Sequence, residues 1–313
     1  MKTVSPQGQM YCGDVILNNN RLLESPLKSS GENGIFNKYD WIKEADSKLI
    51  SAKLLRESAY NKQCEFDSFK KLKVEMGERL TSKEVFDFLT VKVSANKSSV
   101  LMLGYSIELL LKSGVVSLLI NAPKNLLDKK VRSYSHNLLD VALDLDVKLS
   151  DKERDLLEIL SSYIIRETRY PVIPNSQNDY CAKVNKITNF ISDENQFSLG
   201  VKFFERLRKF IKDIDGTSDN VKFHTRMKME ENGYIIFRVG GKLPPVFIIK
   251  FCQSQIDAGV DSLETVNSLL LDFNKVNKTI HSHLMEKSWD SGVFYIVDGK
   301  KGLTRASNRH INR

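Results

Sequence analysis

Cysteine, proline and tryptophan are scarce in this chain of 313 residues, which contains 4, 7 and 2 of them. The cysteines are widely separated, so no pair has the spacing of zinc ligands and no disulfide framework is predicted. They are Cys12, Cys64, Cys181 and Cys252. Such usage suits a reducing compartment, and we expect a cytoplasmic protein.

Several targeting and catalytic signals are also missing. Residues 1–6 have no apolar core, so no signal peptide is predicted. The longest apolar stretch, residues 100–120, is interrupted by Glu108 and Lys112, which predicts a buried amphipathic helix and no membrane partner. No lysine-serine pair opens a helix after residues 240–241, and no Gly-x-Ser-x-Gly element occurs, which excludes a phosphate loop there and a nucleophile elbow.

Metal and cofactor sites are not indicated either. His281 and His283 are two residues apart, which places them on different sides of a helix, and no third ligand accompanies them. We therefore predict no metal and no cofactor.

Charge is the feature that is present in excess. The formal net charge is +8 and the sequence pI is about 9.1, which favours acidic partners such as RNA or anionic lipid. Residues 300–313 are rich in lysine and arginine and contain no acid. This end is either a nucleic-acid arm or a solvated terminus.

Hydrophobic periodicity predicts a mainly helical first half after a polar lead-in at residues 1–37, which contains one short strand at 15–17. A basic connector is expected around residues 124–132. The predicted helices are 40–60 with Asp40 as cap, 83–89 with Ser82 as cap, 97–120, 136–145 with Ser135 as cap, and 151–166 with Ser150 as cap.

The pattern changes after about residue 176. Alternating strands flank residues 231–233, a strong hairpin signal. The predicted elements are helices at 180–191, 196–214 and 263–285 and strands at 221–230, 234–239, 246–251 and 293–297. We therefore predict a mainly α protein: a helical bundle at 38–175 with an insertion at 61–97, followed by a smaller α+β domain at 176–313.

Three short motifs occur in order at helix-length separations, at residues 104–112 (GYSIELLLK), 135–139 (SHNLL) and 166–171 (RETRYP). In this order they resemble the HEPN family of small helical bundles, in its nucleotidyltransferase-associated branch. The resemblance covers residues 40–175, and the insertion at 61–97 is longer than the family's usual one.

The resemblance implies where a site would lie. The family's acidic residue and the lysine four positions later match Glu108 and Lys112, its histidine-initiated helix matches His136, and its closing motif matches Arg169 and Tyr170. On residue types alone, Glu108 and Lys112 form a helical ion pair worth about 0.2–0.5 kcal/mol. The predicted ligand-binding residues are Glu108, Lys112, Arg132 and Tyr170.

His136 is the predicted catalytic base, together with Arg166 and Arg169. A histidine at a helix start favours the neutral form, which accepts a proton from a ribose 2′-hydroxyl. The alternative is that it caps a turn or packs against Tyr134. Arg305 with His310 forms a second candidate set.

The family's ribonucleases carry an arginine, four residues and a histidine on the last bundle helix, and that histidine is absent here. The resemblance implies RNA or nucleotide handling, with a metal-independent ribonuclease of a defence or toxin system as one activity. The alternative is a non-catalytic interaction or nucleotide-sensing subunit that partners a nucleotidyltransferase or another effector. HEPN bundles commonly pair, and the apolar stretch at 100–120 predicts a homo-oligomer here.

Overall fold

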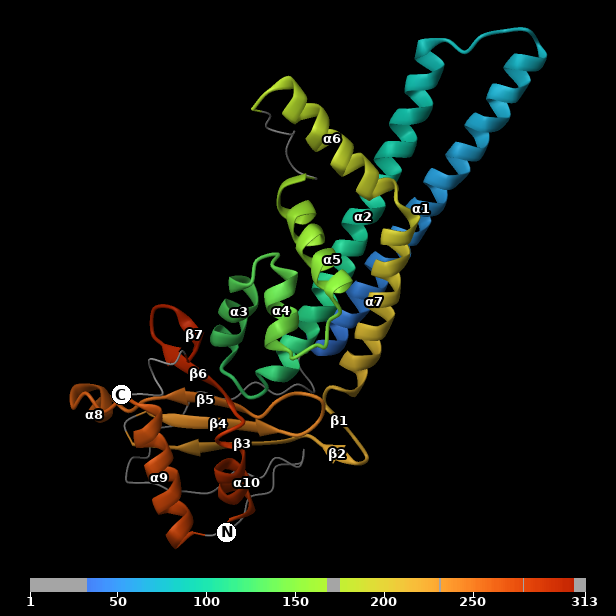
Figure 1. The fold of residues 1–313 in the computed structure, drawn as a ribbon. Coiled ribbons are helices and arrows are strands. Elements are labelled where there is room, and N and C mark those ends of the chain that lie inside the picture. Colours follow the sequence, from blue (N-terminus) through green and yellow to red (C-terminus); the bar gives the residue numbers. More distant parts are fainter. Residues whose placement is uncertain (1–32, 168–174, 231, 278, 307–313) are drawn as a thin grey trace. The chain divides into compact units, whose positions relative to one another are not determined.

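The computed structural model describes residues 33–167, 175–230, 232–277 and 279–306 (Figure 1). These residues are mainly helical, with a small sheet towards the carboxyl end, as the sequence pattern predicted. The strand predicted at residues 15–17 lies outside the described residues.

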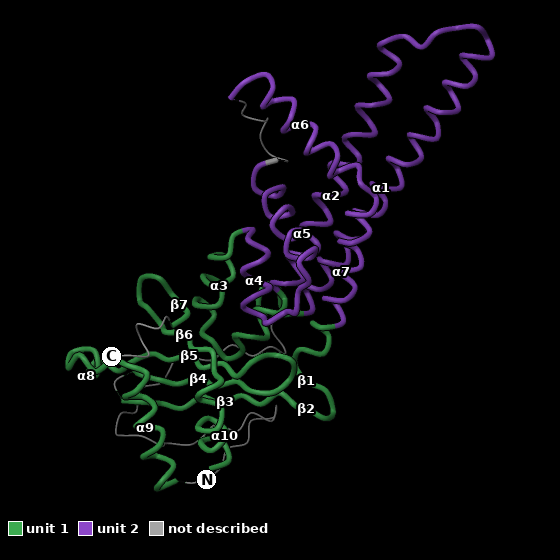
Figure 2. Tube along the Cα trace, viewed as in Figure 1, with its two compact units in different colours: residues 1–38, 113–135, 210–313 green, residues 39–112, 136–209 purple. Residues whose placement is uncertain are grey.

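The chain divides into two compact units, each assembled from separate segments (Figure 2). Unit 1 comprises residues 1–38, 113–135 and 210–313, and unit 2 comprises residues 39–112 and 136–209. The sequence pattern predicted one boundary near residue 176. The division into units passes through three continuous helices, which a change in local periodicity does not reveal.

Unit 2 is all helical. It contains most of three helices that continue into unit 1, namely α1 (Lys38–Glu75), α2 (Ser82–Leu118) and α7 (Glu194–Asp213). It also contains α4 (Leu138–Asp144), α5 (Asp151–Ser162), the π-turn η2 (Tyr163–Glu167) and α6 (Gln177–Ser192).

The helices predicted at 40–60, 83–89 and 97–120 are two longer helices, α1 and α2. Residues 61–75 and 82–96 within the predicted insertion are helical, and most of their side chains are exposed or half-buried. Apolar residues among them, such as Leu72, Phe86 and Val91, are exposed and do not form one buried stripe, so no clear amphipathic period marked these turns. Thr81 caps α2 where Ser82 was predicted to, since Thr81 Oγ1 accepts from Glu84 N at 3.3 Å and Glu84 Oε2 accepts from Thr81 N at 2.8 Å.

Two glycines let the unit 2 helices approach closely. A Cβ on Gly200 of α7 would lie 2.6 Å from Leu103 Cδ2 of α2, and a Cβ on Gly104 would lie 3.1 Å from Ile164 Cδ1 of η2. Residues 103–104 are therefore packed on two sides, which fixes the segment of α2 that carries Glu108.

The helix predicted at 151–166 begins as expected, with Ser150 and Glu153 forming a capping box. It ends at Ser162 and continues as the π-turn η2 to Glu167. The predicted Ser135 cap is wrong: α4 begins at Leu138, and its cap is Asn137, whose side chain accepts from Asp140 N. Ser135 has a φ of 49°, so the chain leaves helical geometry there.

Unit 1 is organised around a five-stranded sheet with the order β3-β4-β5-β6-β7. Its strands are β3 (Phe223–Lys228), β4 (Tyr234–Val239), β5 (Val246–Lys250), β6 (Val293–Asp298) and β7 (Gly302–Arg305). Only β5 and β6 pair in parallel; the other neighbours are antiparallel. The predicted hairpin joins β3 to β4, where Met229 N donates to Gly233 O at 2.8 Å. β1 (Gly216–Thr217) and β2 (Asn220–Val221) form a separate small pair.

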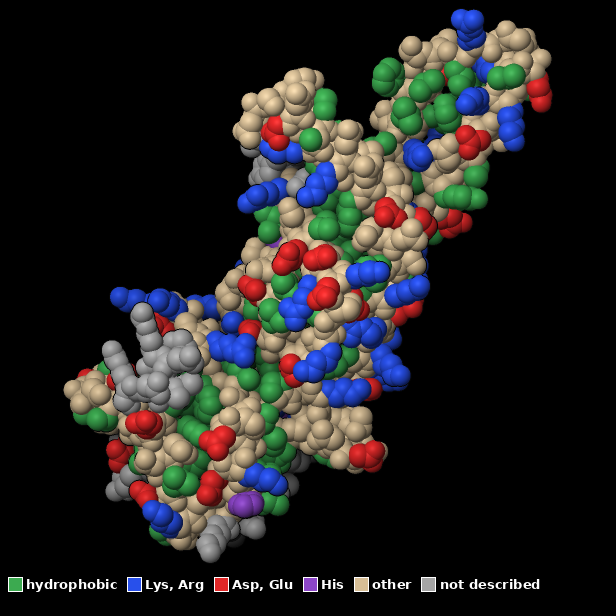
Figure 3. All heavy atoms as spheres, in the orientation of Figure 1, with side chains coloured by type: hydrophobic (Ala, Val, Ile, Leu, Met, Phe, Trp, Pro, Cys, Tyr) green, Lys and Arg blue, Asp and Glu red, His purple; other side chains and the backbone are tan. Residues whose placement is uncertain are grey.

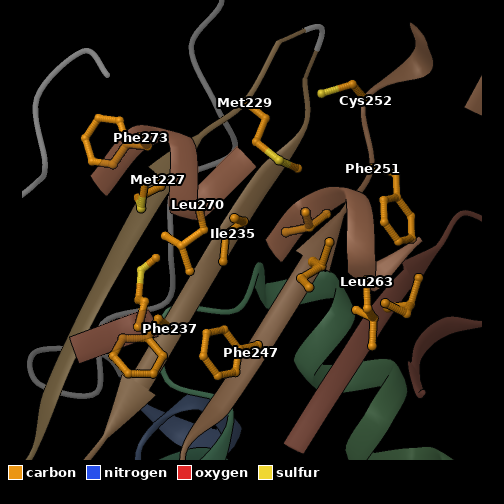
Figure 4. Close-up of a cluster of buried hydrophobic side chains, with 14 residues drawn as sticks. Met227, Met229, Ile235, Phe237, Phe247, Phe251, Cys252, Leu263, Leu270 and Phe273 are labelled. Carbon is orange, nitrogen blue, oxygen red and sulfur yellow. The ribbon is translucent and has the colours of Figure 1, made fainter. Parts of the chain in front are cut away.

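One face of the sheet packs against α9 (Leu263–Val276) and α10 (Ile280–Ser288), which come after the short α8 (Gln253–Asp257). Figure 4 shows this core, in which Phe237 and Phe247 of neighbouring strands meet Leu263 and Leu270 of α9. The single helix predicted at 263–285 is therefore two helices. Its break coincides with Thr279, which caps α10.

The alternate residues of the strands point to the opposite face of the sheet. They include Tyr234 and Arg238 on β4 and Tyr295 on β6, all buried.

The segment predicted as a basic connector is helix α3 (Lys124–Ser133). It packs close to β7, where the Lys129 side chain lies near Gly302. Its buried residues Leu126, Leu127 and Val131 form the apolar face that the many cations obscured.

Among the described residues, α2 is the one helix long and apolar enough to cross a membrane. Its most apolar window is 72% buried, which is typical of a core helix. Val100, Leu103 and Ile107 are each at most 3% exposed, so the stretch that predicted a homo-oligomer is already covered. The homo-oligomer therefore stays a prediction that depends on the family resemblance alone.

Candidate functional site

Glu108 is a buried carboxylate with a partner on each oxygen. It lies on α2 among Ile107, Leu110 and Leu111, which are fully buried, and its side chain is only 7% exposed. Oε1 accepts from Lys112 Nζ at 2.7 Å, and Oε2 lies 2.9 Å from His136 Nδ1. A buried charge is costly unless it is paired and hydrogen-bonded, and both conditions are met here. We call Glu108, Lys112 and His136 the Glu108 cluster.

His136 lies outside the helix in which it was predicted, two residues before α4 begins. The next two residues of the chain fix its position. Asn137 caps α4, and Leu138 N donates to Ser161 Oγ of α5 at 3.0 Å. The imidazole is therefore held by the α4–α5 packing on one side and by Glu108 on the other.

The hydrogen bond fixes which ring nitrogen carries the proton. A carboxylate oxygen only accepts, so Nδ1 of His136 must donate to Glu108 Oε2. The neutral ring then has its lone pair on Nε2. The side chain is 26% exposed, so the ring is not closed off from solvent. A histidine oriented by a carboxylate in this way is arranged to act as a general base.

Tyr105 belongs to this site although it was not predicted as a site residue. Its ring centroid lies 6.4 Å from that of His136 in an edge-on arrangement. The signal was present in the sequence, because Tyr105 lies three residues before Glu108 and therefore on the same face of α2.

The structure brings together Glu108, Lys112 and His136, whereas the described residues Arg166, Arg132 and Arg305 do not hydrogen-bond to Glu108. Arg166 is exposed in η2, and its side chain has no hydrogen bond or ion pair to another described residue. Arg132 lies on α3 of unit 1, where its Nε donates to Asp128 at 2.9 Å and 3.0 Å. Arg305 lies on the edge strand β7. The predicted residues Arg169, Tyr170 and His310 lie outside the described residues.

The described part of the chain contains no group of three or more His, Cys, Asp or Glu side chains that could hold a metal ion. His281 is buried against Phe223, with ring centroids 5.0 Å apart, whereas His283 is exposed. The two histidines thus point to different surroundings, as their spacing predicted.

A second buried polar cluster lies in unit 1, around Asp215. Its Oδ1 accepts from Lys222 Nζ at 3.1 Å, and its Oδ2 accepts from Lys38 and, at 3.1 Å, from Ser117 Oγ. Burial alone would raise the pKa of Asp215, but the charges and hydrogen bonds of Lys222 and Lys38 lower it instead.

Arg238 adds another positive charge beside this carboxylate. Its side chain is almost fully buried, and burial lowers its pKa to about 10. Nε donates to Ser117 O at 3.1 Å and Nη2 to Ile214 O at 3.0 Å. Those carbonyls belong to the last turn of α2 and the end of α7, where the helix dipole is negative. Arg238 therefore ties two helix carboxyl ends to the sheet.

His224 of β3 is the histidine of this second cluster. Its Nδ1 lies 2.5 Å from Asn121 Nδ2, so the ring accepts the hydrogen bond and is neutral. Burial lowers its pKa to about 4, and the nearby charges of Lys222 and Arg238 add to this effect. The cluster around Asp215 is therefore a structural network and not a source of a base.

We compared the chain with family models, curated proteins and solved structures, and none of them matches it. The resemblance to HEPN bundles remains a prediction from the three motifs.

Proposed function

We propose that this chain handles RNA or a nucleotide at the Glu108 cluster, as a metal-independent ribonuclease whose general base is His136. One observation carries the proposal. Glu108 holds Nδ1 of a partly exposed imidazole, which leaves Nε2 as a proton acceptor. Lys112 balances the carboxylate charge, so the pair does not add a net negative charge that would repel phosphate.

The reaction would start with transfer of the ribose 2′-hydroxyl proton to His136 Nε2. The 2′-oxygen then bonds to the adjacent phosphorus, and the bond from phosphorus to the 5′-oxygen breaks. Water gives that leaving oxygen a proton and takes up the one held on His136 Nε2, which returns the ring to its neutral form. The products are a 2′,3′-cyclic phosphate and a 5′-hydroxyl. Arg166 and Arg169 are the proposed phosphate contacts, since an arginine near the phosphorus stabilises the charge that develops there.

The direct test is cleavage of end-labelled single-stranded and hairpin RNAs in EDTA, with product ends identified chemically. We expect cyclic phosphate ends from the intact chain. His136→Ala should lower the rate by at least about 100-fold, because general bases contribute about 10²–10⁴. His283→Ala is the matched control, since that histidine is exposed on α10 and should leave the rate unchanged.

The tail is tested separately through His310→Ala. Deleting residues 303–313 would remove most of β7, in which Leu303 is buried, and would disturb the sheet. Loss of cleavage in His310→Ala with full activity in His136→Ala would move the base to Arg305 and His310. Loss of cleavage in EDTA alone would refute the metal-free mechanism.

The alternative is a non-catalytic subunit that senses a nucleotide or pairs with a nucleotidyltransferase or other effector. It predicts binding without cleavage. Nucleotide or RNA binding that His136→Ala weakens, with no product formed even in the presence of the natural partner, would favour it. Growth arrest on induced expression that His136→Ala relieves would support the toxin or defence setting.

A further inference from the structure

Unit 1 carries a basic surface that shares no residue with the Glu108 cluster or with the network around Asp215. Its cations come from α3 and from the hairpin formed by β6 and β7, and we call them the α3–β7 surface. They are Lys129, Lys130, Arg132, Lys300, Lys301 and Arg305. Figure 3 shows a group of lysine and arginine side chains where Figure 1 draws α3 and β7.

The fold brings these cations together from distant parts of the sequence. α3 packs close to β7, as the proximity of Lys129 and Gly302 shows. Lys130 Nζ lies 5.5 Å from the ring centroid of Tyr295 in β6, which holds this part of α3 beside the hairpin. The positive charges therefore form one surface.

The turn between β6 and β7 is itself fixed. Asp298 Oδ1 accepts from the backbone amides of Lys300 and Lys301, both at 2.7 Å. Within residues 124–134 and 296–306 the only acids are Asp128 and Asp298, and Asp128 is already paired with Arg132. The surface thus has a strong positive excess on a preformed backbone.

The side chains on this surface argue against two other partners, a membrane and a single-stranded nucleic acid. Leu126, Leu127, Val131 and Leu303 are buried, so the surface shows none of the exposed large apolar groups that a membrane-inserting helix presents. Tyr134 and Tyr295 are buried too, with Lys130 over both rings. No described aromatic ring is therefore available here for stacking on the bases of a single strand.

What remains is recognition of closely spaced negative charges on a rigid ligand. A nucleic-acid duplex carries one charge per about 1.7 Å of its axis, and the ten residues of α3 rise about 15 Å. We propose that the α3–β7 surface binds the phosphate backbone of a nucleic-acid duplex without reading its sequence. This binding does not depend on the activity proposed for His136, because no residue of the Glu108 cluster contributes to it.

The test is fluorescence anisotropy with the full chain and two labelled duplexes of about 20 base pairs, long enough to offer several phosphates to the surface. One is DNA and the other is RNA with 2′-O-methyl riboses, which cannot undergo the proposed cleavage. Lys129→Glu combined with Lys301→Glu should raise Kd at least tenfold. It should also reduce the slope of log K against log salt by about two, since each lost phosphate contact removes about 0.9.

The matched control combines Lys275→Glu with Lys287→Glu, the same change in charge on α9 and α10 at the other face of the sheet. It should leave the slope nearly unchanged. The double variant Lys129→Ala with Lys301→Ala removes charge without reversing it, so it should raise Kd by a smaller factor. Circular dichroism checks that all variants stay folded.

Several outcomes would overturn the proposal. One is an equal loss of duplex affinity in the Lys129/Lys301 and Lys275/Lys287 variants. Another is duplex binding that does not weaken as the salt concentration rises. A third is binding to phosphatidylserine vesicles but to neither duplex. Tighter binding of an unstructured single strand than of the duplex would also contradict it. Duplex binding by a chain that cleaves no RNA would support this proposal while refuting the ribonuclease.

Discussion

Glu108 in the helical unit and Asp215 in the sheet unit are both carboxylates, and in each of them both oxygens accept hydrogen bonds from side-chain nitrogens. Glu108 is held by Lys112 and His136, and Asp215 by Lys222 and Lys38. The clusters differ in charge balance. The first pairs one carboxylate with one lysine, whereas the second also contains Arg238, so positive charge is in excess.

This difference decides what the histidine of each cluster can do. Glu108 accepts a hydrogen bond from His136, and that leaves the outer ring nitrogen free to take a proton. His224 instead accepts from Asn121 beside Lys222 and Arg238, so taking a proton would add a positive charge where two are already present. A histidine that faces a carboxylate therefore has its other ring nitrogen left to accept a proton, whereas one that faces buried cations is held neutral.

The largest expected effect concerns Arg238, the member of the second cluster that has no counterpart in the first. Arg238→Met keeps most of the side-chain volume but removes the donors to Ser117 O and Ile214 O. We expect the free energy of unfolding to fall by about 3 kcal/mol or more, since hydrogen bonds to charged groups contribute about 1.5–3 kcal/mol each. Urea unfolding of the variant and of the parent chain measures this difference in free energy.

Lys242→Met is the control for this change. Lys242 is a half-exposed partner of Asp213, and exposed pairs contribute about 0–1 kcal/mol. If Arg238→Met were as stable as the parent chain, the guanidinium would not be the tie between the two helix ends and the sheet.

The second prediction concerns pH and His224. Its pKa of about 4 in the folded chain lies below the ordinary value of 6.5, so the unfolded chain binds the proton first as pH falls. Stability should therefore be full above pH 6.5 and decline towards pH 4, by up to about 3 kcal/mol. Asp215, whose pKa is also lowered, adds to the loss only in the more acidic range, as the pH falls towards and through that lowered pKa.

His224→Gln should make the decline between pH 6.5 and pH 4 shallower, because the amide oxygen can still accept from Asn121 but does not titrate. The decline that remains comes from His281, whose pKa burial also lowers. His283→Gln, at an exposed histidine, should leave the profile unchanged. A parent chain whose stability is constant over this range would show that His224 is not held neutral.

The contrast between the clusters also shows what the sequence could and could not predict. Glu108 and Lys112 were expected to lie together because they are four positions apart on one helix. Bringing His136 to them needed the family resemblance, since residues 109–135 intervene. The second cluster joins Ser117, Asp215 and Arg238 from three segments, and no local pattern reports such long-range pairing.

The same distinction holds for the fold. The strands predicted at 234–239 and 246–251 and the start of α5 came from local apolar patterning and from Ser150 as a cap, and the structure contains them. The parallel pairing of β5 with β6 could not be, because the residues between them fold into α8, α9 and α10. Helix α3 was missed because its cations masked a short apolar face.

The third prediction compares the two histidines directly. His136→Ala should reduce RNA cleavage by at least about 100-fold, or about 2.7 kcal/mol in the barrier, whereas His224→Gln should keep the rate of the parent chain. The measurement is the single-turnover rate on one RNA at pH 7. Equal losses in both variants would mean that the effect is on folding, and far-UV circular dichroism would then show it.

The smallest expected effect is that of Glu108→Gln, which separates orientation from charge. The amide oxygen can still accept from His136 Nδ1, but it no longer stabilises the imidazolium that forms when the 2′-hydroxyl proton is taken. We expect kcat to fall about tenfold, or about 1.4 kcal/mol, with KM unchanged, because the lost interaction exists mainly in the transition state. Glu108→Ala should lower kcat further, since it also releases the ring. A rise in KM with kcat unchanged in Glu108→Gln would instead make Glu108 a residue that only holds substrate or structure.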